Sequence, residues 1–195
     1  ACVGGFTLPF VRKAGHPVPP FDFTVPGVTS ISADLHKYGF AAKGASTVLY
    51  RTPALRRHQF YVYSGWPGGL FGSATVLGTR PGGAIAAAWA SLQSLGEEGF
   101  LRIAKTIMAT TQKLMDGISA IPELFVLGKP DCGVFAFASH GPDLMAIADQ
   151  MEERGWHIDR QQFPTAIHLT ITPAHAPVAD RYLSDLRECV AHIVA

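Results

Sequence analysis

The sequence predicts an α/β protein, and three observations support this class. Apolar, β-branched runs typical of strands alternate with helically spaced apolar residues along the last third of the chain, which indicates a small α/β layer domain. Two more strand-like runs lie in the first third. The 195 residues are 48% hydrophobic, enough to bury one large core or two small ones. We predict one domain over residues 1–97 and a second over residues 98–195.

The first quarter of the chain shows few signs of regular structure. Prolines up to Pro26 argue against a continuous helix there, and residues 1–6 resemble a buried strand that runs into a turn. Residues 28–33 and 46–51 are predicted to be adjacent strands of a covered sheet. The loop between them holds two lysines. Residues 65–83 are dense in glycine and contain no predicted strand.

Helices are predicted from the spacing of small and apolar residues. Residues 84–95 form an alanine-rich helix that Gly96 interrupts, and residues 100–118 continue as an amphipathic helix. Pro142 and Gly155 mark the start and end of a helix over residues 143–154. The apolar face of residues 178–193 predicts a closing helix. The remaining strands are predicted at residues 124–127, 134–138 and 167–172.

Composition argues against several functions. The formal net charge is +1, and Lys and Arg form no cluster of five or more, which argues against a nucleic-acid-binding surface. No apolar run reaches about 18 residues, so no membrane span is predicted in this chain. The eight histidines lack the spacing of a zinc-binding helix, so no metal site is predicted.

The three cysteines, Cys2, Cys132 and Cys189, are far apart in the sequence. They indicate neither a disulfide framework nor a metal site, and buried thiols are the simplest interpretation of Cys132 and Cys189. Reduced thiols fit a cytoplasmic or cytosol-facing location. Because the chain begins at Ala1 rather than at a methionine, we predict that its beginning is missing, and an upstream membrane anchor stays open.

Lys37 is the leading candidate for chemistry. It follows a predicted strand and precedes an aromatic-glycine turn, which places an amine where an enzyme can form a Schiff base with a carbonyl cofactor. The alternative is an ordinary solvated turn lysine. The glycine-rich residues 78–83 have two interpretations as well, an anion-binding turn or a turn that leads into a helix.

Several segments carry a family resemblance. Residues 30–44, SISADLHKYGFAAKG, resemble the pyridoxal-phosphate lysine segment of the sphingosine-1-phosphate lyases, which are fold-type-I, group II decarboxylase-like enzymes. Further segments resemble this family in the same order: ACVGGF at 1–6, PGVTSISAD at 26–34, WPGGLF at 66–71, RPGG at 80–83 and QFPTAIH at 162–168. The resemblance implies the end of a large pyridoxal-phosphate-binding domain followed by a small carboxyl-terminal α/β domain.

The resemblance also implies roles for individual residues. Lys37 matches the lysine that binds pyridoxal 5'-phosphate, and His36 matches a residue near the cofactor phosphate. Lys43 matches a second lysine that binds the substrate phosphate, a role suited to a flexible ammonium group. Ser73 and Thr75 match a stretch that reaches the cofactor phosphate of the neighbouring subunit, which implies a homodimer with a shared active site.

The sequence departs from the family pattern at two positions and lacks one expected residue. Leu35 stands where a small hydroxyl residue is typical, and Ala42 replaces a typical proline. Both departures affect local geometry more than reaction class. The aspartate that pairs with the pyridinium nitrogen would directly precede Ala1. Without it the cofactor ring is a poorer electron sink, and we expect this chain alone to be inactive.

The implied function is a lyase of sphingolipid metabolism. Such an enzyme cleaves a phosphorylated sphingoid base into a long-chain aldehyde and phosphoethanolamine. One alternative is an amino-acid decarboxylase that uses the same lysine, although a free carboxylate substrate would be met better by an arginine than by Lys43. A second alternative is a non-catalytic chain that only dimerises.

Overall fold

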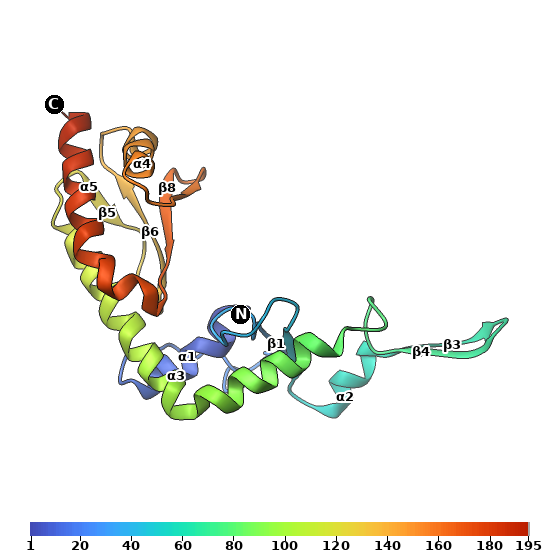
Figure 1. Cartoon of the computed structure of the whole chain (residues 1–195). Coiled ribbons are helices and arrows are strands. Elements are labelled where there is room, and N and C mark those ends of the chain that lie inside the picture. The colour runs from blue at the N-terminus through green and yellow to red at the C-terminus, as the bar shows by residue number, and fades with distance from the viewer. Residues whose placement is uncertain (195) are drawn as a thin grey trace. The chain divides into compact units, whose positions relative to one another are not determined.

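The computed structural model describes residues 1–194, which form two compact units. The first unit comprises Ala1–Phe10 and Val18–Glu98, and the second comprises Val11–Pro17 together with the chain from Gly99 onward. The predicted domain ranges place Val11–Pro17 with the first domain, whereas these residues cluster with the second unit. Figure 1 shows the elements of both units.

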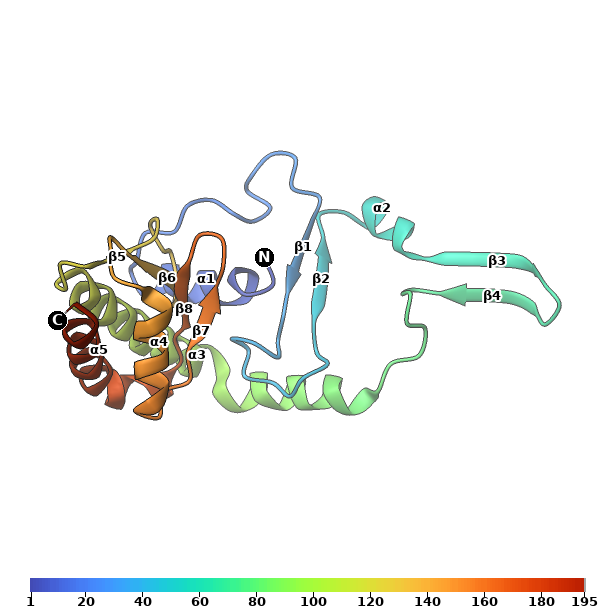
Figure 2. The ribbon, with the colours of Figure 1, turned by 90° about the horizontal axis from the view of Figure 1, so that it is seen from above.

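The first unit is built from short elements. Its helices are α1 (Gly4–Lys13) up to Phe10, α2 (Pro53–Arg56) and the start of α3 (Gly82–Ser119), and a 3-10 turn, η1, covers Arg57–Gln59. Its strands form two antiparallel pairs, β1 (Ser30–Ala33) with β2 (Thr47–Tyr50) and β3 (Tyr61–Trp66) with β4 (Gly69–Ser73). Figure 2 shows β1 and β2 side by side. This pairing joins Ser30 to Tyr50 and Ala33 to Thr47.

Helix α1 corrects the prediction for the first quarter of the chain. Residues 4–13 are helical although Pro9 lies inside them, and residues 1–6 form no strand. Pro9 lacks one backbone donor, but tertiary burial of Thr7 and Val11, one turn apart, favours the helix. The rings of Phe6 and Phe10 pack beside them with centroids 5.7 Å apart.

The pairs β1–β2 and β3–β4 are more exposed than the sequence predicts. The predicted strands at 28–33 and 46–51 do pair, but Val48 and Leu49 of β2 are each 48% exposed, so the expected covered sheet is wrong for β2. The hairpin β3–β4 was not predicted, and glycines at positions 65, 68, 69 and 72 interrupt its strand pattern. Its strands are exposed along almost their whole length, and the hairpin projects from α2 in both Figure 1 and Figure 2.

Helix α3 contains the interruption that the sequence predicts. Gly96 has φ 58° and ψ −178°, so the helix breaks there and resumes. A positive φ with an extended ψ is a conformation that glycine adopts readily and side-chain-bearing residues do not. The predicted helices at 84–95 and 100–118 are therefore confirmed as the two parts of α3.

The second unit contains a four-stranded antiparallel sheet in the order β5-β6-β8-β7. The strands are β5 (Leu124–Val126), β6 (Val134–Ser139), β7 (Asp159–Gln161) and β8 (Ala166–Thr170). With them lie α4 (Leu144–Glu153), the 3-10 helix η2 (Pro173–Val178) and α5 (Ala179–Val194). The core forms between strands and helices, with fully buried side chains from both: Ile107, Leu114, Ile118, Phe137, Ile147, Met151, Ile167 and Leu186.

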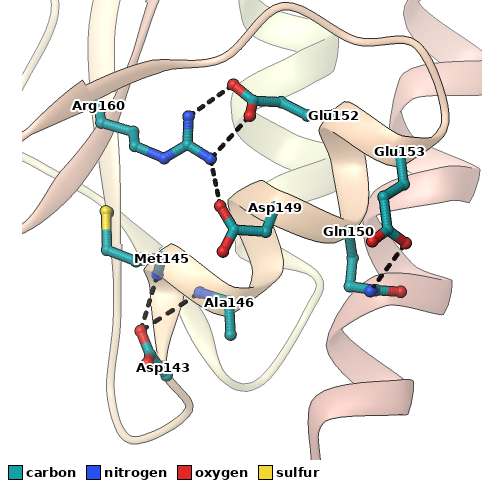
Figure 3. A network of polar contacts seen from close by, with 8 residues as sticks. All are labelled: Asp143, Met145, Ala146, Asp149, Gln150, Glu152, Glu153 and Arg160. Carbon is teal, nitrogen blue, oxygen red and sulfur yellow. Dashed lines mark hydrogen bonds and ion pairs between the residues drawn. The ribbon is translucent and has the colours of Figure 1, made fainter.

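Most elements of this unit match the sequence predictions, and β7 and η2 are the exceptions. Helix α4 begins after Asp143, whose carboxylate accepts hydrogen bonds from the backbone N–H groups of Met145 and Ala146 at 2.9 and 3.4 Å. Strand β7 is short and polar, so no apolar pattern marks it. Arg160 of β7 pairs with Glu152 and Asp149 of α4, as Figure 3 shows.

No helix within residues 1–194 combines the length and the apolar character that a bilayer crossing requires. In the same residues, no group of three His, Cys, Asp or Glu side chains is arranged to hold a metal ion.

Candidate active site around Lys37

Lys37 lies in the loop that joins β1 to β2, residues 34–46, which we call the lysine loop. Backbone hydrogen bonds from Lys37 N to Asp34 O (3.3 Å) and from Phe40 N to Lys37 O (3.0 Å) fold its first half into consecutive turns. The backbone of Leu35 packs so closely against Gly39 that only glycine fits there, because a Cβ would lie 2.5 Å from the carbonyl oxygen of Leu35. The aromatic-glycine turn noted in the sequence thus has a steric cause.

The neighbours of Lys37 anchor the loop and leave the lysine side chain exposed. Tyr38 is buried, and its ring packs edge-on against Phe40 with centroids 6.4 Å apart. Ala45, near the end of the loop, is also buried. The Lys37 side chain is 40% exposed. Because Tyr38 is buried, it anchors the backbone beside Lys37, and the Lys37 ε-amine stays accessible at the surface of the loop.

Two side chains contact the ε-amine of Lys37. Its Nζ lies 3.1 Å from Sγ of Cys2 and 3.3 Å from Oδ2 of Asp34. The hydrogen bond with Cys2, followed by the one with Asp34, raises the pKa of Lys37 above its ordinary value. The hydrogen bond from Lys37 also lowers the pKa of the Cys2 thiol. These contacts favour an ammonium beside a thiolate-prone sulfur.

Asp34 connects the loop to β1 and β2. The Ser46 hydroxyl donates a short hydrogen bond to its carboxylate, and the Asp34 N–H donates to the carbonyl of Cys2 at 2.9 Å. The hydrogen bond from Ser46, and then the one from Lys37, lowers the pKa of Asp34. Asp34 is therefore the anion of this site at neutral pH.

His36 precedes Lys37 in the lysine loop, and its ring lies between the Ala45 carbonyl and the Asp34 carboxylate. Its Nδ1 lies 2.6 Å from the carbonyl oxygen of Ala45, so this nitrogen carries the proton and donates it. Its Nε2 lies 3.9 Å from Oδ2 of Asp34. The Ala45 contact fixes the ring, and Nε2 is left as the nitrogen that can meet another group.

Lys43 lies further along the same loop and is exposed. It forms no ion pair or hydrogen bond with the residues from 1 to 194. The structure therefore places a second, uncommitted ammonium group on the loop that carries Lys37.

Ser73 and Thr75 lie at and after the end of β4 and contact each other. The Ser73 hydroxyl donates to the carbonyl of Thr75 at 2.6 Å. The Thr75 hydroxyl oxygen is buried and has no hydrogen-bond partner in the described chain. No hydrogen bond between described residues joins this pair to the lysine loop. The structure thus brings Lys37 and His36 together but not these two residues with them.

Three contact residues escaped the sequence analysis as functional candidates: Cys2, Asp34 and Ser46. Asp34 carried a usable signal, because its position three residues before Lys37 lets one turn of the chain bring the two charges together. Cys2 and Ser46 are separated from their partners by 35 and 12 residues, and only the fold brings them close.

The chain was compared with families of known proteins and with individual relatives. No family model matches the chain. The chain is 52% identical over 194 residues to a sphingosine-1-phosphate lyase of Arabidopsis thaliana, an alignment that covers all of this chain and 36% of that protein. The chain therefore spans about a third of the length of the curated relatives it matches.

Solved structures extend the likeness to three dimensions. The structure of a Burkholderia pseudomallei sphingosine-1-phosphate lyase is 46% identical with a TM-score of 0.94, over 98% of this chain and 44% of that chain. A Lactobacillus brevis glutamate decarboxylase, 17% identical with a TM-score of 0.80 over 99% of this chain and 46% of that chain, shares the fold. The predicted fold, that of fold-type-I pyridoxal-phosphate-dependent enzymes, is confirmed.

Proposed function

Since this chain is homologous along its whole length to a portion of the sphingosine-1-phosphate lyases, we propose that it forms the lysine-bearing part of a pyridoxal-phosphate-dependent carbon–carbon lyase. The reaction is cleavage of a phosphorylated sphingoid base into a long-chain aldehyde and phosphoethanolamine, a step of sphingolipid breakdown. The observation that carries the proposal is the exposed ε-amine of Lys37, held between Asp34 and Cys2 at the end of β1.

The residues present fit pyridoxal 5'-phosphate. Lys37 offers a primary amine for its aldehyde, and this amine is accessible at the loop surface. The Thr75 hydroxyl is a buried polar group without a partner among the described residues, so it is a donor that suits a phosphate, and the Ser73 hydroxyl beside it donates to the Thr75 carbonyl. When bound, the cofactor ring serves as an electron sink for the bond that breaks.

Each residue of the lysine loop has a separate task in this proposal. Lys37 would hold the cofactor through Nζ, and its free amine holds a proton on that nitrogen because the hydrogen bonds with Cys2 and Asp34 raise its pKa. Asp34 keeps the ammonium oriented toward the end of β1. His36, whose ring is fixed by its bond to Ala45, would lie near the cofactor phosphate.

Covalent trapping tests the role of Lys37 without requiring turnover. The chain is incubated with pyridoxal 5'-phosphate, reduced with borohydride and mapped by mass spectrometry. We expect the pyridoxyl group on Lys37, and none at this position in Lys37→Arg. Lys43 is the matched lysine of the same loop. Labelling that is equal at Lys37 and Lys43 would reduce Lys37 to an ordinary surface amine.

We assign the substrate phosphate to Lys43, whose ammonium group has no partner among the described residues. This residue also separates the lyase from an amino-acid decarboxylase, whose carboxylate substrate would not need it. In the cofactor-loaded chain, Lys43→Ala should weaken binding of a phosphorylated sphingoid base by about ten-fold or more, the loss of one charge-assisted contact. Cofactor labelling of Lys37 should persist. Equal loss of both would contradict the assignment.

We propose that a second copy of this chain covers the hairpin β3–β4 and receives Ser73 and Thr75 at its own site. The support is an apolar surface that the described residues leave open, with side chains 43–75% exposed: Tyr61, Val62, Tyr63, Trp66, Leu70 and Phe71. Aromatic contacts between the two strands hold this surface together, with Trp66 and Phe71 centroids 6.1 Å apart.

Sedimentation equilibrium tests the dimer. Charged substitutions in the hairpin, Trp66→Asp with Leu70→Asp, should shift the chain toward monomer. The control is Phe163→Asp, which changes an apolar side chain that is 91% exposed outside the hairpin and should leave self-association unchanged. A chain that is monomeric without substitution, or one that the control disrupts equally, would contradict the assignment of the interface.

We also propose a cytosol-facing location. The three cysteines are free thiols in the structure, including the exposed Cys2, which fits a reducing compartment.

A further inference from the structure

Cys2 and Lys37 form a pair of nucleophiles that the proposed reaction does not use as a pair. Cys2 Sγ and Lys37 Nζ are 3.1 Å apart, and both residues are exposed. The Cys2 carbonyl accepts the Asp34 N–H at 2.9 Å, and α1 begins two residues later, so the backbone at Cys2 is held against the end of β1.

We propose that Cys2 is an oxidative modification site, at which a peroxide converts the Cys2–Lys37 contact into a covalent sulfur–nitrogen bond that external thiols reverse. This modification would remove the ε-amine that the proposed function needs. Its consequence for cofactor binding rests on the proposed function, whereas the chemistry of the cross-link does not.

The modification balances in two steps. The Cys2 thiol and hydrogen peroxide give a sulfenic acid and one water, so that sulfur is oxidised and the peroxide is reduced. The neutral Lys37 amine then attacks Sγ, the S–O bond breaks, and hydroxide leaves with a proton from the nitrogen as a second water. The product is a sulfenamide between the two side chains. Two external thiols then reduce it to the starting thiol and amine and form one disulfide.

The environment makes Cys2 the reactive thiol of the three. The hydrogen bond from Lys37 lowers the pKa of the Cys2 thiol and so increases the fraction of nucleophilic thiolate. Burial raises the pKa of Cys132 and of Cys189. Lys37 reaches Cys2 directly, so the sulfenic acid forms next to an amine that can trap it.

Peptide mapping of the oxidised chain tests the proposal before any cofactor is added. After treatment with hydrogen peroxide, the intact mass should fall by two hydrogen atoms, and one cross-linked peptide pair should contain Cys2 and Lys37. Dithiothreitol should restore the original mass. Cys2→Ser should abolish the cross-link, and Lys37→Arg should abolish it while leaving a Cys2 sulfenic acid that dimedone labels. Lys43→Arg, the matched change in the same loop, should retain it.

A second measurement connects the cross-link to the site. Oxidised chain should lose borohydride-trapped pyridoxal 5'-phosphate at Lys37 and regain it after dithiothreitol. If the cross-link forms but the reduced chain never takes up the cofactor at Lys37, the proposed function fails and the modification site stands. Oxidation of Cys2 to sulfinic acid without a cross-link, or a cross-link that persists in Lys37→Arg, would overturn the modification site itself.

Discussion

The carboxylate of Asp34 lies 3.3 Å from the ε-amine of Lys37, within one turn of the lysine loop. The same carboxylate accepts a hydrogen bond from the Ser46 hydroxyl, so one aspartate links Lys37 to the residue that precedes β2. Asp34 thus influences both the charge of Lys37 and the geometry of the loop, and substitution separates the two effects.

Asp34→Asn should lower the pKa of Lys37, because it removes one of the two hydrogen bonds that raise it. A larger fraction of the amine is then neutral at a given pH, and the pH profile of Lys37 acylation should shift to lower pH. Limited labelling with acetic anhydride, followed by peptide mapping, measures this profile. Lys43 in the same digest is the internal control. An unchanged Lys37 profile would show that Asp34 does not control the charge of the amine.

The stability contributed by Asp34 should depend on pH in one direction. Its folded pKa is lowered, first by the Ser46 hydrogen bond, so the folded state favours the carboxylate. The stabilisation is present above the ordinary carboxyl pKa and is lost as the pH falls through the lowered folded pKa. Denaturant unfolding of the chain and of Asp34→Asn should therefore differ most near neutral pH and converge in acid. A difference that stays constant with pH would contradict this.

Gly5→Ala should destabilise the first unit by about 1–3 kcal/mol, the usual cost of overpacking. A Cβ at Gly5 would lie 2.5 Å from the carbonyl oxygen of Ser32, a backbone atom of β1 that cannot yield locally. Gly4→Ala is the matched control, because its Cβ would meet only the flexible end of Leu8, with the closest atom at 2.9 Å. Chemical denaturation should show a large decrease in the free energy of unfolding for Gly5→Ala and a small one for Gly4→Ala.

Asp185→Ala should lower the free energy of unfolding by about 1–3 kcal/mol, because it leaves the half-buried indole N–H of Trp156 without its acceptor. Asp185 is 18% exposed and accepts the indole N–H of Trp156 at 2.8 Å, and Arg154 and Arg181 flank it, each at 3.5 Å. Asp149→Ala is the comparison. Its ion pair with Arg160 is more exposed, so we expect at most about 1 kcal/mol. If thermal unfolding shows that Asp185→Ala and Asp149→Ala lose similar amounts of stability, the role assigned to Asp185 is contradicted.

The second unit was largely predictable, because its elements carry their own apolar patterns. Ile147 and Met151 fall on one face of α4, and Asp143 caps the start of that helix. The hairpin β3–β4 was not predictable in this way, because the glycines of its sequence favour many backbone conformations. Helix α1 was missed for the opposite reason. Pro9 argues against a helix locally, and the burial of Thr7 and Val11 against the rest of the fold overrides it.

The sequence by itself determined the order of most strands and helices and the break at Gly96, and it singled out Lys37 as the candidate reactive lysine, because local patterns and a recognisable lysine segment carry that information. Only the tertiary structure placed Cys2 and Ser46 in the site. Their contacts with Lys37 and Asp34 span 35 and 12 residues, and no local pattern records which distant side chains the chain brings within hydrogen-bond distance. The charge of the Lys37 amine depends on these neighbours, so it was decided by the fold.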